Sequence, residues 1–418
     1  MKDKNEKDIF GVWMNMKIHL KNVDGIFDYS SSKYNSFNVF VMKKHYISRT
    51  ENNNLKCYKQ QGDVPNEEKT LFSINYSKEG MPKIEKLHLS KLEQNEKNIN
   101  LLNHYIWYVI NSVDNNDINE NEDYFLSEND ILKFGKVKYI VKEIHIENYK
   151  SPNNNNDKIF ETNYICKEHK NCEYCGKLMV RLCDCKEFEH IGCIKDWIND
   201  RIIERETDNK LIKSYYFSIF QCKEYKTRKC NEEKCEKENC CEKCNTYYPL
   251  HFKLDQNENQ SKEENKEKNE QKDYIEFYKI KKPENCDYLI LESLPHLDKI
   301  SNSPKIEKDI HIIKLIEEKD INIGSGKSND VIIHDKSVCQ IHSVIKYYKE
   351  EKKILLKNKS KRAGTLAFIK DQKIFLSEKN QYFQIDKTFF SARLIKKNEI
   401  KNLVKDFNED EGVKIIEL

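Results

Sequence analysis

Cysteine and histidine side chains with the spacing of metal ligands are concentrated in the middle of the chain. Twelve of its 15 cysteines fall between Cys166 and Cys244. Within this window four pairs of ligands follow one another, and their members are Cys172, Cys175, Cys183, Cys185, His190, Cys193, Cys241 and Cys244. Two thiolates separated by a tight turn can point at one metal ion, and a second pair completes a tetrahedral site. The spacing therefore predicts two zinc ions, held by seven cysteines and one histidine.

The same cysteines could instead form disulfides in a small secreted module. The chain opens with Met1-Lys-Asp-Lys-Asn and shows no apolar signal region, which predicts an intracellular, reducing compartment, the cytoplasm or the nucleus. Zinc coordination is therefore favoured over disulfides. No stretch approaches the roughly 18 apolar residues that a membrane span requires, so no membrane span is expected.

The charge balance argues against a broad attraction to polyanions. The 418 residues include 73 Lys and Arg and 70 Asp and Glu, which gives a formal net charge of +3. A chain so nearly neutral sets up no global field toward nucleic acid or a membrane surface. No nucleic-acid partner is therefore expected.

Two polar tracts divide the chain. Residues 151–157 are rich in asparagine, and residues 255–272 contain no aliphatic side chain with which to build a core. Such composition predicts linkers, and the second is expected to be disordered. The units that they separate are residues 1–148, 160–254 and 273–418, each in the size range of one domain.

The segment after Cys193 predicts an amphipathic helix. Apolar residues recur from Ile194 with the three- and four-residue spacing of a helix that has one buried face. Such a helix would place Trp197 against the zinc centre. Residues 215–220, which are mostly aromatic, predict the strand that follows.

This cysteine-rich window resembles the RING-CH family, zinc fingers whose ligands run in the order of four cysteines, one histidine and three cysteines. The resemblance rests on the single residue between Cys183 and Cys185, on the segment His190-Ile-Gly-Cys-Ile-Lys-Asp-Trp-Ile, and on the long insert before the last pair. In that family the ligand pairs alternate between the two ions. The resemblance implies that one zinc is held by Cys172, Cys175, His190 and Cys193. The other would be held by Cys183, Cys185, Cys241 and Cys244.

The seventh ligand has an alternative. Phe220 stands two residues before Cys222, as an aromatic residue usually does before the seventh ligand of the family, so Cys222 competes with Cys241. The Asn-Thr-Tyr-Tyr-Pro segment after Cys244 favours Cys241. The remaining thiols of the insert are Cys222, Cys230, Cys235 and Cys240. They offer a third zinc site, although their wide spacing lacks the close pairs that favour tetrahedral coordination.

The resemblance implies a protein partner and no reaction at the metal. Protein would fill all four positions on each ion, so zinc would only hold the loops in place. The groove that binds a ubiquitin-conjugating enzyme in this family matches Tyr174 and Trp197, although Trp197 could equally serve core packing. No catalytic residue is expected, because the conjugating enzyme carries the thioester. Tyr174 and Asn245 depart from the residues that active members often carry.

Near the C-terminal end, short β-branched segments between turn residues predict an all-β sandwich. The segment from Leu289 to Leu394 resembles the forkhead-associated (FHA) domain. The resemblance rests on Gly324 after an isoleucine, on the Asn-Asp-Val-Ile-Ile run, on His342, and on Gly364 followed by threonine. It implies a domain that contacts other proteins.

The side chains that contact phosphate in FHA domains are replaced in this chain. Those domains bind phosphothreonine through an arginine after the first glycine, a serine and an arginine before the histidine, and an asparagine before Gly-Thr. The matching positions hold Ser325, Cys339, Gln340 and Ala363. Each hydrogen bond to an anion contributes roughly 1.5–3 kcal/mol, so the loss of several should weaken the affinity for phosphopeptides by orders of magnitude. Contacts that do not depend on phosphate are therefore expected. The same loops carry Lys327, Lys361 and Arg362, which are more simply explained as solvated charges.

Residues 125–144 and 375–394 predict an internal repeat. Both begin with Phe-Leu-Ser-Glu and continue with alternating apolar residues. The first copy also resembles the turn near the end of FHA domains. Residues 1–148 are therefore interpreted as a degenerate FHA-like β domain, with an unrelated β-rich domain as the alternative. The expected fold class is multidomain and mostly β, with an FHA-like sandwich at each end and a RING-type α+β zinc module between them.

Two functions follow from this organisation. In the first, the chain is a RING-CH ubiquitin ligase, or an adaptor derived from one, and its FHA-like domains select protein partners. In the second, the zinc and FHA-like units are structural, and the chain is a non-catalytic scaffold. The changes at Tyr174 and Asn245 favour the scaffold, whereas the complete set of eight ligands and the Trp197 helix favour the ligase.

Overall fold

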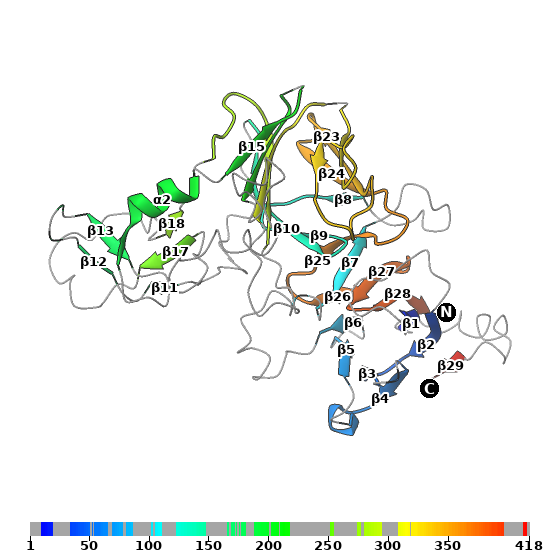
Figure 1. The fold of residues 1–418 in the computed structure, drawn as a ribbon. Helices are drawn as coiled ribbons and strands as arrows, with labels where there is room; N and C mark the ends of the chain where they lie inside the picture. Colours follow the sequence, from blue (N-terminus) through cyan, green and yellow to red (C-terminus); the bar gives the residue numbers. More distant parts are fainter. Residues whose placement is uncertain are drawn as a thin grey trace, which may run out of the picture. The chain divides into compact units, whose positions relative to one another are not determined.

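The computed structural model describes the β-rich parts of the chain (Figure 1). The described residues are 10–19, 34–50, 52, 54–65, 69–77, 81–86, 102, 105–110, 123–147, 165–166, 169–171, 173, 175, 177–180, 188–199, 202–208, 210–217, 251–254, 274–276, 280–294, 308–317, 319–396 and 413–415. They fall into two compact units: unit 1 contains Met1–Tyr149 and Leu315–Leu418, and unit 2 contains Lys150–Lys314. The prediction of a mostly β protein is confirmed.

Unit 1 takes its strands from both ends of the sequence. The strands before residue 150 are β1 (Phe10–His19), β2 (Tyr34–Val41), β3 (His45–Arg49), β4 (Leu55–Tyr58), β5 (Lys69–Tyr76), β6 (Pro82–Glu85), β7 (Trp107–Ile110), β8 (Tyr124–Phe125), β9 (Ile131–Phe134) and β10 (Val137–His145). The strands after residue 314 are β21 (Ile321–Gly324), β22 (Val331–Ile332), β23 (Ser343–Tyr348), β24 (Lys353–Asn358), β25 (Thr365–Phe368), β26 (Lys373–Phe375), β27 (Gln381–Ile385), β28 (Thr388–Lys396) and β29 (Val413–Ile415). A short 3-10 helix, η1 (Gln61–Asp63), follows β4.

These strands form three ladders in which the two ends of the chain are mixed. One runs in the order β10-β9-β25-β7-β27-β28-β1-β2-β29, and two five-stranded sheets have the orders β22-β21-β23-β24-β8 and β26-β6-β5-β3-β4. The orange β28 lies beside the blue β1 in Figure 1, and their pairing is antiparallel with Val12 opposite Leu394. The sequence-based division placed these two segments in separate domains, whereas in the structure they share every one of these ladders.

Alternation of apolar and polar residues explains how the long strands bury one face. In β1 the residues Val12, Met14, Met16 and Ile18 are fully buried, and they point to the same face because successive side chains of a strand alternate. Their partners on β28 include Phe390, which stacks on Phe72 of β5 with ring centroids 4.9 Å apart. These residues belong to one core that joins segments from both ends of the sequence.

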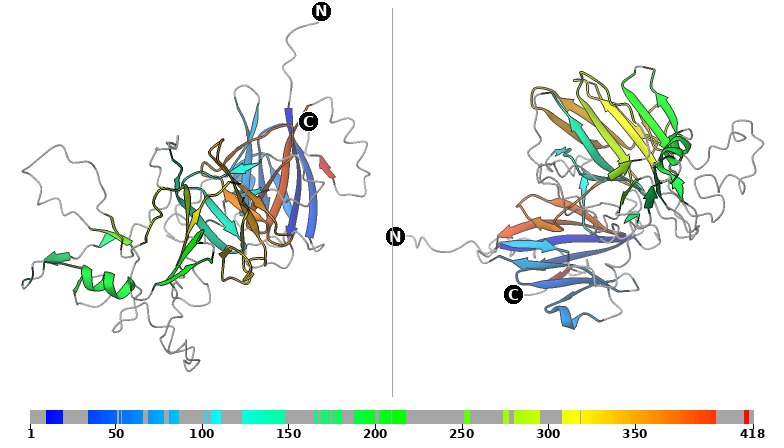
Figure 2. Two further views of the ribbon diagram at one scale, coloured as in Figure 1. Left: turned by 90° about the horizontal axis from the view of Figure 1, so that it is seen from above. Right: turned by 90° about the vertical axis from the view of Figure 1, so that its left-hand side faces the viewer.

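Unit 2 contains two small sheets and one larger antiparallel ladder. Its strands are β11 (Ile165–Cys166), β12 (His169–Asn171), β13 (Leu178–Val180), β14 (Glu189–His190), β15 (Ile203–Glu206), β16 (Ile212–Phe217), β17 (His251–Leu254), β18 (Tyr274–Glu276), β19 (Tyr288–Ser293) and β20 (Lys308–Lys314). The ladder has the order β15-β16-β20-β19, and the small sheets are β11-β17-β18 and β12-β13-β14. Buried side chains of the ladder form their own core around Tyr215, Ile290 and Ile312. The green and yellow strands of the ladder lie side by side in Figure 2.

The helix expected after Cys193 is present with shifted bounds. It is α2 (Ile191–Asn199), so it begins three residues before Ile194 and includes Cys193. The helix ends where the side chain of Asn199 donates a hydrogen bond to the carbonyl of Lys195 over 2.6 Å. The expected strand over residues 215–220 lies at β16, which begins earlier in the chain.

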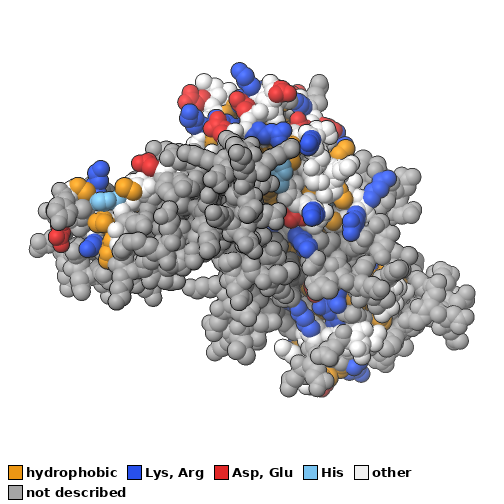
Figure 3. All heavy atoms as spheres, in the orientation of Figure 1, with side chains coloured by type: hydrophobic (Ala, Val, Ile, Leu, Met, Phe, Trp, Pro, Cys, Tyr) orange, Lys and Arg blue, Asp and Glu red, His pale blue; other side chains and the backbone are white. Residues whose placement is uncertain are grey.

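Two surface properties follow from the described residues. On the face drawn in Figure 3, basic side chains stand among uncharged and acidic ones, which agrees with the small net charge of +3. Among the described residues no helix is both long and apolar enough to cross a membrane.

Candidate functional site

The candidate metal centre is built on the small sheet of β12, β13 and β14 and on the helix α2. Antiparallel pairing places His190 of β14 opposite Met179 of β13, and the helix follows His190 directly. Cys175 lies on the turn between β12 and β13, and Cys193 lies in the first turn of α2. A hairpin, a strand end and a helix start therefore carry Cys175, His190 and Cys193, the three predicted ligands that the structure describes.

Cys175 and His190 lie next to each other. The Sγ atom of Cys175 is 3.4 Å from Nε2 of His190. Two ligands of one tetrahedral zinc, with bonds of about 2.3 Å to sulfur and about 2.0–2.1 Å to nitrogen, are separated by about 3.6 Å. The contact therefore has the separation that a shared ion requires. It joins members of the first and third predicted pairs, which the alternating order of the family resemblance would place on one ion.

Most of the expected ligand set lies outside the described residues. This holds for Cys172, Cys183, Cys185, Cys241 and Cys244, and also for Tyr174 and the insert thiols Cys222, Cys230, Cys235 and Cys240. Trp197 belongs to α2, but its side chain is outside the description. Among the described residues no three His, Cys, Asp or Glu side chains converge as a metal site would.

A second candidate site lies where three loops of unit 1 meet, at the positions expected to form the FHA phosphate pocket. The backbone N–H of Ser325 donates to the carbonyl of Cys339 over 2.9 Å, and its hydroxyl donates to the carbonyl of Val338 over 2.8 Å. The loop after β24 joins them, because Sγ of Cys339 is 3.0 Å from Oγ of Ser360. Ser360 in turn accepts a hydrogen bond from the backbone N–H of Ala363. The structure thus brings Ser325, Cys339 and Ala363 into one cluster.

Close approach of these loops explains the glycine at the end of β21. A Cβ atom on Gly324 would lie 2.2 Å from the carbonyl oxygen of Gln340, so a larger residue would push the loops apart. The side chain of Asn329 crosses the same gap and donates to the carbonyls of Gly326 and Gln340. The replaced positions therefore belong to a tightly bonded loop cluster.

His342 fixes the geometry of this cluster as a neutral imidazole. Its Nε2 atom donates to the carbonyl of Gly364 over 2.9 Å, and its Nδ1 atom accepts from the backbone N–H of Cys339 over 3.1 Å. Burial lowers the pKa of His342 to about 4, so the ring is uncharged at neutral pH. The ring also meets Phe134 edge to face, with centroids 5.7 Å apart. This histidine supports the loops and offers no positive charge to an anion.

The remaining polar groups of the cluster are directed inward. Ser325, Cys339 and Ser360 hydrogen-bond to neighbouring loops, whereas Gln340 is exposed. The cationic side chains Lys327, Lys361 and Arg362 are exposed around the cluster. Charge-assisted bonds to a phosphate require several donors that converge on it. In this loop cluster, Ser325, Cys339 and Ser360 do not present donors that converge on one phosphate position.

We therefore expect unphosphorylated and phosphothreonine peptides to bind unit 1 equally, within about threefold. Calorimetric titration of the full chain at low salt with a degenerate peptide library, in matched phosphorylated and unphosphorylated forms, measures this. Low salt is the stringent condition, because weak attraction to Lys327, Lys361 and Arg362 is then least screened. A gain of about tenfold for the phosphorylated library, roughly 1.4 kcal/mol, would contradict the expectation.

A serine–histidine pair in unit 2 escaped the sequence analysis. Oγ of Ser214 lies 2.9 Å from Nδ1 of His311, and the two residues face each other on β16 and β20. His311 is fully buried and packs edge to face on Tyr216, so no substrate can reach it. The pair is a structural cross-strand hydrogen bond.

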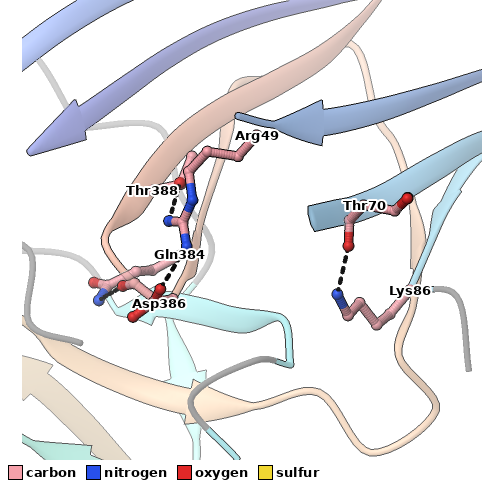
Figure 4. Close-up of polar contacts among 6 residues, drawn as sticks. All are labelled: Arg49, Thr70, Lys86, Gln384, Asp386 and Thr388. Atoms are coloured by element: carbon pink, nitrogen blue, oxygen red, sulfur yellow. Dashed lines mark hydrogen bonds and ion pairs between the residues drawn. The ribbon is translucent and has the colours of Figure 1, made fainter. Parts of the chain in front are cut away.

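Buried charged residues of unit 1 also escaped the sequence analysis. Arg49 at the end of β3 forms an ion pair with Asp386 over 2.7 Å and donates to the hydroxyl of Thr388 (Figure 4). Lys133 and Lys138 face each other across β9 and β10, and both are almost fully buried. No signal in the sequence marked them, because isolated basic residues in a lysine-rich chain resemble surface residues.

No protein-family model, no curated protein and no solved structure matches the chain.

Proposed function

We propose that the chain is a zinc-binding RING-type protein that acts through protein contacts in ubiquitin transfer, as a ligase or as an adaptor. The observation that carries the proposal is the 3.4 Å contact between Cys175 and His190, which has the separation of two ligands on one zinc. Their positions in the sequence suit the alternating ligand order of the RING-CH resemblance. Zinc would hold the sheet β12-β13-β14 to α2, and Trp197 on that helix would meet a ubiquitin-conjugating enzyme.

Unit 1 would supply partner recognition that does not depend on phosphate. Support comes from the loop cluster, where Ser325 and Cys339 hydrogen-bond to neighbouring loops and burial keeps His342 neutral. The same cluster favours a second candidate, a scaffold in which the FHA-like and RING-like parts serve only assembly. The two candidates differ in whether ubiquitin is transferred.

The test combines zinc content with ubiquitin transfer in the full chain. Cys175→Ser and Cys193→Ser should each lose about one zinc per chain by elemental analysis, because a tetrahedral site with three ligands binds weakly. Cys286→Ser is the matched control, since Cys286 is a free thiol outside the predicted ligands. It should keep the zinc content of the unsubstituted chain.

With a panel of ubiquitin-conjugating enzymes, the unsubstituted chain and Cys286→Ser should transfer ubiquitin, whereas Cys175→Ser should not. Trp197→Ala should lose transfer with its zinc content unchanged, because a groove residue acts in the encounter. Zinc binding without transfer by any enzyme of the panel would reject the ligase and support the scaffold. Unchanged zinc content in both ligand variants would reject the metal centre itself.

A further inference from the structure

The two ends of unit 1 contain the same succession of paired strands. In the N-terminal set, β3 pairs with β5, β5 with β6, and β9 with β10. In the C-terminal set, the corresponding pairs are β21 with β23, β23 with β24, and β27 with β28. In sequence, an antiparallel hairpin also precedes each set: β1-β2 precedes β3, and β19-β20, which belongs to unit 2, precedes β21. The Phe-Leu-Ser-Glu repeat falls at the same place in both sets. It begins at Phe125, the last residue of β8, and at Phe375, the last residue of β26.

The final strands of each set pair with the other set. β8 pairs with β24 and β9 with β25, whereas β26 pairs with β6 and β27 with β7. β7 and β25 pair with each other, with Tyr108 opposite Ala367. The same two residues are the partners of Phe383 and Leu132, which occupy equal places in the two hairpins. The pattern is that of an approximate twofold relation centred between β7 and β25.

We propose that unit 1 is built from two copies of one β module that have exchanged their final strands, and that its side chains select this exchanged arrangement. The alternative is a closed arrangement, in which β26 would lie on β24 and β8 on β6, each within its own copy. The two arrangements bring different residues together. Their relative stability can therefore be judged from the pairs that each would form.

Charges on the exchanged edge strands favour the exchanged arrangement. The Nζ atom of Lys373 lies 4.0 Å from a carboxylate oxygen of Glu85, and the Nζ atom of Lys357 lies 3.5 Å from a carboxylate oxygen of Asp123. Phe375 of β26 lies opposite Lys83, and Phe125 of β8 lies opposite Leu355. Because the two phenylalanines hold the same place in the repeat, closure would put each of them at the other's position. Lys373 would then lie opposite Lys357, and Asp123 opposite Glu85. Like charges directly opposite each other on a sheet are destabilising. Closure would thus replace two attractions by two repulsions.

The hairpin turns make the same distinction. The turn of β9-β10 begins with Gly135, and a Cβ atom there would lie 2.5 Å from the carbonyl oxygen of Ser337. The next residue, Lys136, donates its backbone N–H to Oγ of Ser337 over 2.8 Å. The turn of β27-β28 has Asp386 at the place of Gly135, also with a positive φ. Closure would bring the Asp386 side chain against Ser337, where only glycine fits.

The ion pair at the β27-β28 turn also favours the exchanged arrangement. Asp386 binds Arg49 of the other copy, with side chains 19% and 9% exposed respectively. Closure would bring Gly135 to Arg49 and leave that buried guanidinium without its carboxylate. Each turn therefore matches the copy to which it has been donated.

Paired cysteines can distinguish the two arrangements in the full chain. Glu85→Cys with Lys373→Cys, and Asp123→Cys with Lys357→Cys, place thiols opposite each other only after exchange. Lys357→Cys with Lys373→Cys, and Glu85→Cys with Asp123→Cys, do so only after closure. Residues directly opposite in a sheet lie within the Cα separation of a disulfide. All four variants keep the same native thiols, so each is a control for the others.

The readout uses a protease recognition sequence placed within residues 255–272. After mild oxidation and cleavage, an exchange-specific disulfide joins the two fragments on a non-reducing gel, whereas a closure-specific disulfide lies inside one fragment. We expect the first two variants to yield joined fragments at least tenfold more than the last two, with peptide masses that identify the bond. The yield should not change on tenfold dilution.

Disulfides that form preferentially in the closure-specific variants would overturn the proposal. A yield of joined fragments that falls with dilution would overturn it as well, because the exchange would then occur between two chains. Neither outcome bears on zinc or on ubiquitin transfer, since all the engineered cysteines lie in unit 1 and the protease sequence lies outside the predicted zinc ligands.

Discussion

Arg49→Ala should lower the free energy of unfolding of unit 1 by about 3 kcal/mol. Removing one partner of a buried ion pair typically costs about 3–5 kcal/mol, because the other charge is left in a poorly solvated place. The lower end applies here, since the Asp386 side chain is 19% exposed. Arg49 also donates to Thr388, and that hydroxyl would lose its partner.

The measurement is urea unfolding followed by tryptophan fluorescence in a Trp197→Phe background. The signal then comes from Trp13 and Trp107, which both lie in unit 1. Asp386→Asn and the double variant complete a double-mutant cycle, in which the two losses should be far from additive. Lys353→Ala is the matched control, because its pair with Glu351 is about half exposed and should contribute less than about 1 kcal/mol. A loss below about 1 kcal/mol in Arg49→Ala would show that the pair does not secure the β27-β28 hairpin.

Unit 1 should become more stable as the pH rises from 7 to 9. Burial, with a smaller contribution from the Lys138 ammonium, lowers the pKa of Lys133 from 10.5 to about 7. Burial lowers the pKa of Lys138 to about 8. The unfolded chain therefore binds more protons than the folded chain between these values and 10.5, so the free energy of unfolding rises with pH in this window. One pKa unit corresponds to about 1.4 kcal/mol, which gives an increase on the order of 2–4 kcal/mol between pH 7 and 9.

Lys133→Met should raise the stability at pH 7 and remove about half of this pH dependence. Methionine has a similar length and carries no charge that must be desolvated, so it suits the place beside Trp107, whose ring centre is 5.7 Å from the lysine Nζ. Urea unfolding at both pH values measures the slope, and Lys353→Met, at an exposed site, should leave it unchanged. A large loss of stability at both pH values in Lys133→Met would mean that polar contacts of the ammonium outweigh its burial.

The sequence predicted local properties of the fold better than its pairing. Alternating apolar residues in segments 125–144 and 375–394 indicated strands, because side-chain direction depends only on adjacent residues. The strands β9 and β27 and most of β10 and β28 lie there. Alternation cannot specify which strand lies alongside, so the pairing of β28 with β1 and of β8 with β24 could not be predicted. The repeated Phe-Leu-Ser-Glu segments indicated a duplication, but they appear the same whether the copies are closed or exchanged.

The candidate sites show the same difference: local features were predicted from the sequence, whereas contacts between distant residues were not. Spacing predicted Cys175 and His190 as ligands, and the family resemblance predicted that they share one zinc. Their 3.4 Å contact agrees with that pairing. Spacing gave no indication of Arg49 and Asp386, whose contact joins residues 337 positions apart. Spacing also gave no indication that Lys133 is buried, because its burial results from the tertiary arrangement around β9.

The pairing of distant strands imposes a delay during synthesis. The turn of β9-β10 reaches its partner Ser337 only after a further 201 residues have been made. At about 5–20 residues per second, the ribosome needs roughly 10–40 s for that length. Throughout this interval the strand edges of β6, β7 and β9 that later pair with β25 and β26 have no partner, and open strand edges are the sites at which chains associate with one another. The nascent chain is therefore most exposed to aggregation, and most in need of a chaperone, after its first strands have emerged and before β24 and β25 have been synthesised.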